Sequence, residues 1–261
     1  MILHAPSRWR SIDCISDLHL HAADTYTTKA WRDYLACTNA DALFILGDLF
    51  EVWVGDDILA DSSSFEAQCS QALKQASARL DVFIMHGNRD FLMGDALMDA
   101  CGATLLSDPT VLVYGSEQWL LSHGDALCLD DHAYMQFRQQ VRSQEWQSEF
   151  LAKPLSERQA IARSLRTQSE ATKHRAEGYA DVDTAAALTW LDDQGCQTLL
   201  HGHTHKPGQH ALAASYRRIV LSDWDLLAPV PRSEVLRLAL GTDGAVTTKR
   251  LAPEQAGLSA P

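Results

Sequence analysis

A recurring pattern restricts this sequence more than any other feature: an apolar run of strand length ends in a metal-binding type of side chain, usually beside a glycine. In residues 42–50, the apolar residues 43–46 suit a strand buried on both faces, and Gly47 permits a sharp turn. Asp48 is then expected at the carboxyl end of the strand, where open α/β sheets bind ligands. Taken alone, Asp after Gly is more often a plain turn residue. The interpretation therefore depends on the rest of the chain.

The same pattern recurs at three further apolar runs. Each run has the length of a strand and ends in a side chain with a nitrogen or oxygen donor. In order, they are residues 82–90 with Asn88, residues 119–125 with His123, and residues 198–205 with His203 and His205. Because strands that end alike can present their donors at one edge of a sheet, we expect these side chains to converge.

An earlier run, residues 12–20, carries two more donors. Asp17 and His19 lie two positions apart in it. On an extended backbone, residues at this spacing project to the same side. A lone Asp-x-His pair is common by chance, but with the other strand ends it predicts a carboxylate and an imidazole on one ion.

The expected donors form a mixed set of oxygen and nitrogen ligands. They are Asp17, His19, Asp48, Asn88, His123, His203 and His205. The set is too large for one ion of ordinary coordination, and without a thiolate it suits manganese or iron, with zinc as an alternative. Two ions that share the Asp48 carboxylate accommodate every donor. Such a pair, roughly 3.5–4 Å apart, activates water as hydroxide for displacement at phosphorus.

The chain resembles the calcineurin-like metallophosphoesterase superfamily over residues 12–206. The resemblance is carried, in order, by Asp17-x-His19, Gly47-Asp48, Gly87-Asn88, His123 and Gly202-His203-x-His205. It implies an α/β fold in which a β-sandwich is flanked by helices, in αββα layers. The implied ligand sets are Asp17, His19 and His205 for one ion and Asn88, His123 and His203 for the other, with Asp48 as the bridge.

Within that superfamily the sequence is similar to the UDP-2,3-diacylglucosamine hydrolase family of lipid A biosynthesis. The matching runs are residues 16–20, 45–57, 86–92 and 201–207. The resemblance implies that the pyrophosphate of a nucleotide-lipid substrate, UDP-2,3-diacylglucosamine, is hydrolysed to 2,3-diacylglucosamine 1-phosphate (lipid X) and UMP. It also implies two Mn²⁺ ions as cofactors and a peripheral location at the cytoplasmic face of the inner membrane.

The same resemblance implies roles for individual residues. The implied catalytic residues are Asp48, Asn88, Arg89 and His203. The implied substrate contacts are Asn88, Arg89, Asp131, Ser169 and His203. Thr172 and Arg175 stand where the family has Asn and Lys, and Lys173 is an alternative contact.

The presence of arginine at position 89 indicates a pyrophosphate substrate, because of the leaving group that such a substrate has. Many relatives have His after Gly-Asn, and His can protonate an alkoxide leaving group, whereas a guanidinium is not a proton donor. A phosphate monoester, with a second pKa of about 6, leaves without such help. Arg89 can instead bind phosphate oxygens as a planar fork. The competing interpretation of this arginine is a surface ion pair.

The segment that follows His123 lacks the strand pattern, and we interpret about residues 130–178 as a helical insertion that forms a lid over the site. Residues 138–175 hold 8 of the 22 basic residues against 4 acidic ones, on a chain with a net charge of −12. This local basic character indicates either an anionic ligand or a solvated helical face. Phe137 and Val141 either belong to the core or line a groove for acyl chains.

We expect a single domain at residues 1–251 and a disordered tail at residues 252–261. The acidic composition argues against nucleic acid as a partner. Six scattered cysteines without a Cys-x-x-Cys pair predict small buried residues. The sequence contains no run of about 18 apolar residues and therefore predicts no membrane span.

The acyl chains of the implied substrate require access to a bilayer, so we expect peripheral binding to a membrane surface through the insertion. No obligate protein partner is evident.

Two other functions remain open on the sequence alone. One is a different metallophosphoesterase activity, on cyclic nucleotides, nucleic acid or phosphoprotein. The other is a metal-binding scaffold that has lost catalysis. All of the expected ligand positions carry donor side chains, which disfavours the scaffold.

Overall fold

A mixed sheet of six strands carries the amino-terminal part of the site. The computed structural model describes residues 1–173 and 180–258. The order across this sheet is β12 (Val246–Leu251), β11 (Val235–Leu240), β2 (Ser11–Ile15), β3 (Ala42–Leu46), β4 (Asp81–Met85) and β5 (Ala103–Leu106). Strands β2 to β5 run parallel, so their carboxyl ends meet at one edge. β11 and β12 form an antiparallel hairpin at the edge of this sheet.

A second sheet of six strands packs against the first. Its order is β1 (Ile2–His4), β6 (Thr110–Tyr114), β7 (Glu117–Leu121), β8 (Thr198–His201), β10 (Tyr216–Val220) and β9 (Gly208–Ala213). β7, β8 and β10 are parallel neighbours. The pairing of β7 with β8 continues past the strands, where the Gly202 N–H donates to the carbonyl of His123 at 3.0 Å. The segments that follow these strands therefore lie side by side.

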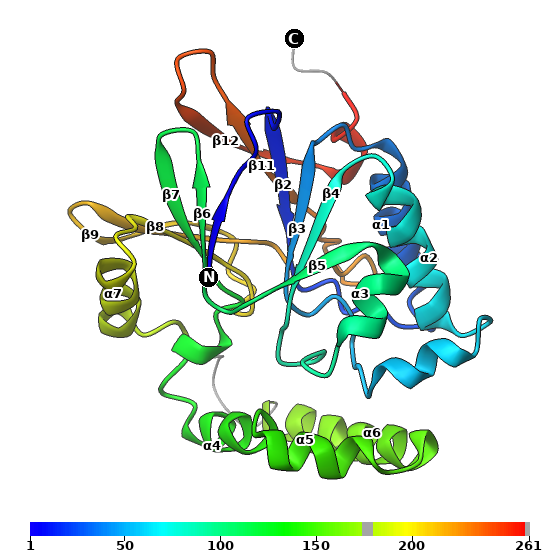
Figure 1. Cartoon of the computed structure of the whole chain (residues 1–261). Helices are drawn as coiled ribbons and strands as arrows, with labels where there is room; N and C mark the ends of the chain where they lie inside the picture. The colour runs from blue at the N-terminus through cyan, green and yellow to red at the C-terminus, as the bar shows by residue number, and fades with distance from the viewer. Residues whose placement is uncertain (174–179, 259–261) are drawn as a thin grey trace.

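Strand β3 shows how the layers are built. Leu43 and Ile45 pack into the core beneath the helices, whereas Phe44 and Leu46 pack into the core between the sheets. The covering helices are α1 (Thr25–Cys37), α2 (Phe65–Ser77) and α3 (Asp95–Cys101) on the first sheet and α7 (Thr184–Asp193) on the second (Figure 1). This order of layers confirms the predicted αββα fold class.

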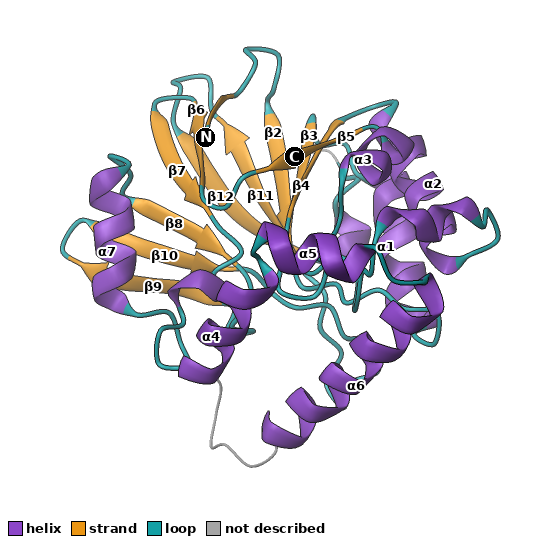
Figure 2. Ribbon diagram, turned by 60° about the horizontal axis from the view of Figure 1, so that its bottom comes forward, coloured by secondary structure: helices purple, strands orange, loops and turns teal. Residues whose placement is uncertain are grey.

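The described part of the expected insertion consists of three helices. They are α4 (His132–Val141), α5 (Gln144–Leu151) and α6 (Leu155–Lys173). They lie together below both sheets in Figure 1, and Figure 2 shows them from the front. We call these three helices the lid.

Side chains of the lid attach it to the sheet that carries β3. Arg158 is 2% exposed; its guanidinium pairs with Asp57 and donates to the carbonyl of Val54. Trp146 stacks on Phe150 with ring centroids 4.7 Å apart, and Phe150 belongs to the core beneath α1 and α2. The lid is therefore held by an ion pair and by an apolar contact.

The structure bears on two sequence interpretations. Val141 is 2% exposed, which agrees with the first of its two interpretations, a core residue. The expected disorder of residues 252–258 is wrong. This segment includes the short helix η3 (Pro253–Gln255), which contacts α1, and Ala256 is fully buried. The Ala256 carbonyl accepts a hydrogen bond of 2.8 Å from Arg237, a long-range contact that the composition does not reveal. The last three residues lie outside the described ranges.

Candidate metal centre

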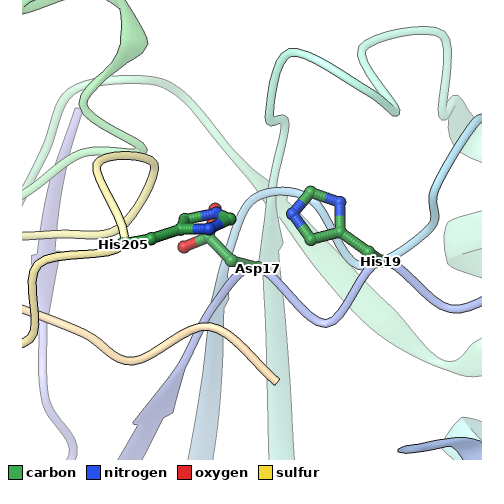
Figure 3. A group of neighbouring side chains, drawn as sticks. All are labelled: Asp17, His19 and His205. Atoms are coloured by element: carbon green, nitrogen blue, oxygen red, sulfur yellow. The ribbon is translucent and has the colours of Figure 1, made fainter. Parts of the chain in front are cut away.

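Asp17, His19 and His205 form one half of a donor cluster at the carboxyl ends of β2 and β8. Donor atoms of all three lie within 4.8 Å of one another, and Figure 3 shows both imidazoles beside the carboxylate. The closest pair joins His205 Nε2 to Asp17 Oδ1 at 3.4 Å. These residues come from segments nearly two hundred positions apart in the chain, so the fold brings together what the strand-end pattern predicted separately.

Asn88, His123 and His203 form the other half of the cluster. The Asn88 Oδ1 atom lies 3.0 Å from His123 Nε2 and 2.9 Å from His203 Nδ1. His123 is fully buried, and its Nδ1 lies 2.9 Å from the carbonyl of Leu46. An amide oxygen and two imidazole nitrogens thus point at one place, and such donors suit a divalent transition-metal ion.

Asp48 lies between the two halves. Its Oδ2 atom is 3.9 Å from His19 Nε2 and 3.7 Å from His123 Nε2. Its other oxygen, Oδ1, accepts a 2.8 Å hydrogen bond from the backbone N–H of Arg89. The carboxylate is 2% exposed. Its Oδ2 therefore lies within 4 Å of a histidine in each half, as a bridging ligand requires.

Five of the donor residues have an unusual backbone conformation. The φ angles are positive for Asp17 (54°), His19 (48°), Asp48 (52°), His203 (64°) and His205 (52°). Such conformations cost on the order of 1–3 kcal/mol each and cluster at functional sites. The expected extended geometry of Asp17 and His19 is therefore wrong, because β2 ends at Ile15. The two side chains converge through left-handed turns.

Glycines permit the close approach of the loops that carry the donors. A Cβ atom at Gly87 would lie 2.0 Å from Asp48 Oδ1, and one at Gly202 would lie 2.2 Å from Asp17 Oδ2. At Gly47, where φ is +89°, it would lie 2.4 Å from the His123 ring. The glycines beside Asp48, Asn88 and His203 are thus required by packing against a second donor.

Burial and charge act in opposite directions on two adjacent imidazoles. Burial lowers the pKa of His123, but the carboxylates of Asp48, Asp17 and Asp125 outweigh burial and raise this pKa to about 9. Burial and the charge of His123 lower the pKa of His203 to about 3. The carboxylates therefore stabilise positive charge at His123 but not on both imidazoles at once, and the donor set fits two divalent cations.

Comparison with known proteins decides the family. The model of the family described as calcineurin-like phosphoesterase matches residues 10–207. The chain belongs to this family. It is 46% identical over 224 residues to the UDP-2,3-diacylglucosamine hydrolase of Chromobacterium violaceum, covering 82% of this chain and 90% of the relative. It is 44% identical over 217 residues to the protein of the same name from Chromohalobacter salexigens, covering 80% and 87%.

One solved structure is similar to this phosphoesterase, but more distantly than the two sequence relatives. The structure of vacuolar protein sorting 29 from Cryptosporidium parvum has a TM-score of 0.43 at 13% identity, covering 94% of this chain and 98% of the other. The sequence relatives are far closer, and they place the chain with the UDP-2,3-diacylglucosamine hydrolases of the phosphoesterase family.

The predicted substrate contacts lie in different parts of the phosphoesterase. Arg89 is beside the donor cluster, with Nη1 3.2 Å from Glu51. Asp131 is exposed and caps α4 by accepting a 3.0 Å hydrogen bond from the Tyr134 N–H. The backbone of α6 includes Ser169, Thr172 and Lys173, but their side chains and the whole of Arg175 lie outside the described residues. These contacts stay predictions.

Two buried carboxylates beside the cluster escaped the sequence interpretation. Glu51 Oε2 lies 3.3 Å from His19 Nδ1, and Asp223 Oδ2 lies 3.5 Å from His205 Nδ1. Glu51 stands three residues after Asp48. Asp223 follows β10. The pairing of β10 with β8 brings it to the centre, and this tertiary contact leaves no pattern in the local sequence. The only local signal was an acid shortly after a strand, three residues after β10 for Asp223 and five after β3 for Glu51.

Proposed function

We propose that this phosphoesterase hydrolyses the pyrophosphate bond of UDP-2,3-diacylglucosamine, releasing 2,3-diacylglucosamine 1-phosphate and UMP in lipid A biosynthesis. The single observation that carries the chemistry is the placement of Asp48 between two donor sets. The substrate rests on the names and the 44% and 46% identities of the two relatives. The family alone supports a more general conclusion, that the chain is a metal-dependent hydrolase of phosphate esters.

The residues of the chain would hold two ions, and we infer that these are Mn²⁺. One ion would be held by Asp17, His19 and His205. The other would be held by Asn88, His123 and His203, and Asp48 would contact both ions. When bound, the ions supply an activated water and stabilise negative charge at phosphorus. The mixed oxygen and nitrogen donors, without a thiolate, support manganese over softer metals.

Arg89 is proposed to bind the pyrophosphate. Its guanidinium is mostly buried, with the side chain 18% exposed, and lies 3.2 Å from Glu51. A fixed guanidinium offers a planar fork to phosphate oxygens and keeps its charge at any ordinary pH. The leaving phosphate monoester, with a second pKa of about 6, needs no proton from the enzyme. This chemistry supports a pyrophosphate over an alkyl phosphodiester.

The test is turnover of UDP-2,3-diacylglucosamine by purified protein with added Mn²⁺. We expect release of UMP, abolished by a chelator and restored by Mn²⁺. Protein that binds the metal but releases no UMP contradicts the proposal. Hydrolysis of bis(p-nitrophenyl) phosphate or a cyclic nucleotide in that case would support another phosphoesterase activity, and no hydrolysis at all would support a metal-binding scaffold.

We also propose that the protein binds the cytoplasmic face of the inner membrane peripherally, through the lid. Among the described residues, no helix combines the length and the apolar character that a membrane span needs. Support for lid binding comes from the basic excess of residues 138–175 and from two exposed apolar side chains, Leu151 at 42% and Leu165 at 37%. An acylated substrate requires access to a bilayer.

Vesicle sedimentation tests this proposal with a matched pair of variants. Leu151→Ser with Leu165→Ser is expected to weaken binding to anionic vesicles several-fold, because two apolar contacts are lost. The control is Leu227→Ser with Val230→Ser, which removes side chains 58% and 73% exposed outside the lid. If only the control pair reduced binding, the membrane surface would be the loop that carries Leu227, and the lid proposal would be wrong.

A further inference from the structure

The two histidines of the first half of the centre each lie against a buried carboxylate. His19 Nδ1 is 3.3 Å from Glu51, and His205 Nδ1 is 3.5 Å from Asp223. The opposite nitrogens point into the centre, with His19 Nε2 facing Asp48 and His205 Nε2 facing Asp17. This geometry leaves each Nε2 for a metal ion, and the carboxylate beside each Nδ1 favours the tautomer that carries its proton there, which makes the imidazole a better metal ligand.

Both carboxylates are held in place by arginines. Asp223, with its side chain 4% exposed, accepts hydrogen bonds from Arg232 Nε at 3.0 Å and Nη2 at 2.7 Å. Glu51 lies 3.2 Å from Arg89 and 3.1 Å from Arg166 of the lid. Because these partners fix the acids, the orientations of His19 and His205 are set before any ion arrives.

The second half of the centre lacks this arrangement. His123 Nδ1 faces a neutral backbone carbonyl, and His203 points Nδ1 at Asn88. Asp125 is buried near His123, but its Oδ2 is occupied by the Tyr134 hydroxyl at 2.5 Å and by Arg138 Nε at 2.7 Å. The ligand that corresponds to the Asp17 carboxylate is the neutral amide of Asn88.

We propose that the two halves bind their ions with unequal affinity, and that Glu51 and Asp223 are the positioning residues that make the first half the tighter one. The inference rests on the two-ion centre proposed above. The first half has one more negative ligand, Asp17, so a divalent cation gains more Coulomb energy there. The carboxylates beside its histidines hold both imidazoles in the orientation that a metal ion needs. Carboxylates of this kind change metal affinity by about 10- to 100-fold.

Unequal affinity gives an order of loading. The ion of the first half binds first and stays bound at low metal concentration. The second ion then joins a cluster that already carries positive charge and shares Asp48 with it, which further weakens its binding. Turnover, which requires both ions, follows occupancy of the second half.

The test is calorimetric titration of the metal-free full-length protein with Mn²⁺, together with metal counting by mass spectrometry after dialysis. For the native chain we expect two phases of one ion each. Asp223→Asn and Glu51→Gln are each expected to weaken the tight phase by about 10- to 100-fold. Asn88→Ala is expected to keep the tight phase and lose the weak one.

Asp13→Asn is the matched control. Asp13 is fully buried and is held by Arg237 Nε at 2.7 Å and Nη2 at 2.9 Å, as Asp223 is held by Arg232, but it touches none of the metal donors. It should leave both phases unchanged. Two equal phases in the native chain, or an unchanged tight phase in both test variants, would overturn the inference. If one test variant misfolds, the other and the native titration still decide. No Mn²⁺ binding at all would instead contradict the proposed function.

Discussion

At the scale of single residues, steric fit between loops determines the centre as much as the donors do. The glycines beside Asp48, Asn88 and His203 leave room for a donor on another loop, which a Cβ would strike. The donors themselves were predictable, because each follows an apolar run of strand length. Their left-handed backbones were not, since periodicity carries no information on φ after a strand has ended.

Gly87→Ala tests the steric argument. The new Cβ would lie 2.0 Å from Asp48 Oδ1 and 2.3 Å from the Asp48 backbone nitrogen, so we expect Asp48 to be displaced. UMP release should fall by about 100-fold or more, in line with misplacement of a reacting group by an ångström. The measurement is kcat with saturating Mn²⁺, with circular dichroism to verify the fold.

The control for this variant is Gly195→Ala. Gly195 has a φ of +64° but no atom within 4 Å of its added Cβ, so alanine there causes backbone strain of about 1 kcal/mol without a clash. It should lower stability slightly and leave kcat unchanged. Equal losses of kcat in the two variants would show that strain, and not the clash with Asp48, explains the effect.

At the scale of elements, the lid depends on one buried arginine. Arg158 reaches from α6 to Asp57 and the Val54 carbonyl, both in the segment that follows the Asp48 strand. The sequence predicted a basic helical insertion but not its attachment, because a salt bridge across a hundred positions leaves no local pattern. The tail at residues 252–258 was mispredicted for the same reason, since Arg237 holds it from a distant strand.

Arg158→Met is expected to loosen the lid. The variant removes charge-assisted hydrogen bonds worth roughly 1.5–3 kcal/mol in total, and Asp57, 57% exposed at its side chain, can regain water. We expect hydrogen exchange at residues 155–166 to speed up and KM for the acylated substrate to rise more than kcat falls. Lys153→Met, which removes only the exposed pair with Glu157, should do neither. Unchanged exchange in the Arg158 variant would exclude it as the anchor.

At the scale of the whole molecule, two sheets with parallel neighbours place all of the donors at one end of the sandwich. The αββα layers were predicted through the family resemblance, and the apolar runs indicated the strands. The order of strands within each sheet could not be predicted, because pairing is decided by contacts such as β8 with β10 that join distant segments. Asp223, which reaches the centre through that pairing, was missed for this reason.

Metal should stabilise the folded chain as a whole. An ion that binds only the native state adds about 2.7 kcal/mol when its concentration is 100 times its Kd. We therefore expect the melting temperature to rise with Mn²⁺ and to fall with a chelator, with a smaller rise for Asp223→Asn. A melting temperature independent of Mn²⁺ would argue that the centre is not formed by the folded state.

The central claim is that Asp48 joins two ions, and metal counting on two variants tests it most directly. Asp48→Ala should abolish UMP release and weaken both ions together, because its Oδ2 lies between His19 and His123. Asp17→Ala should chiefly weaken the ion of its own half. Retention of two tightly bound ions per chain in the Asp48 variant would contradict the account.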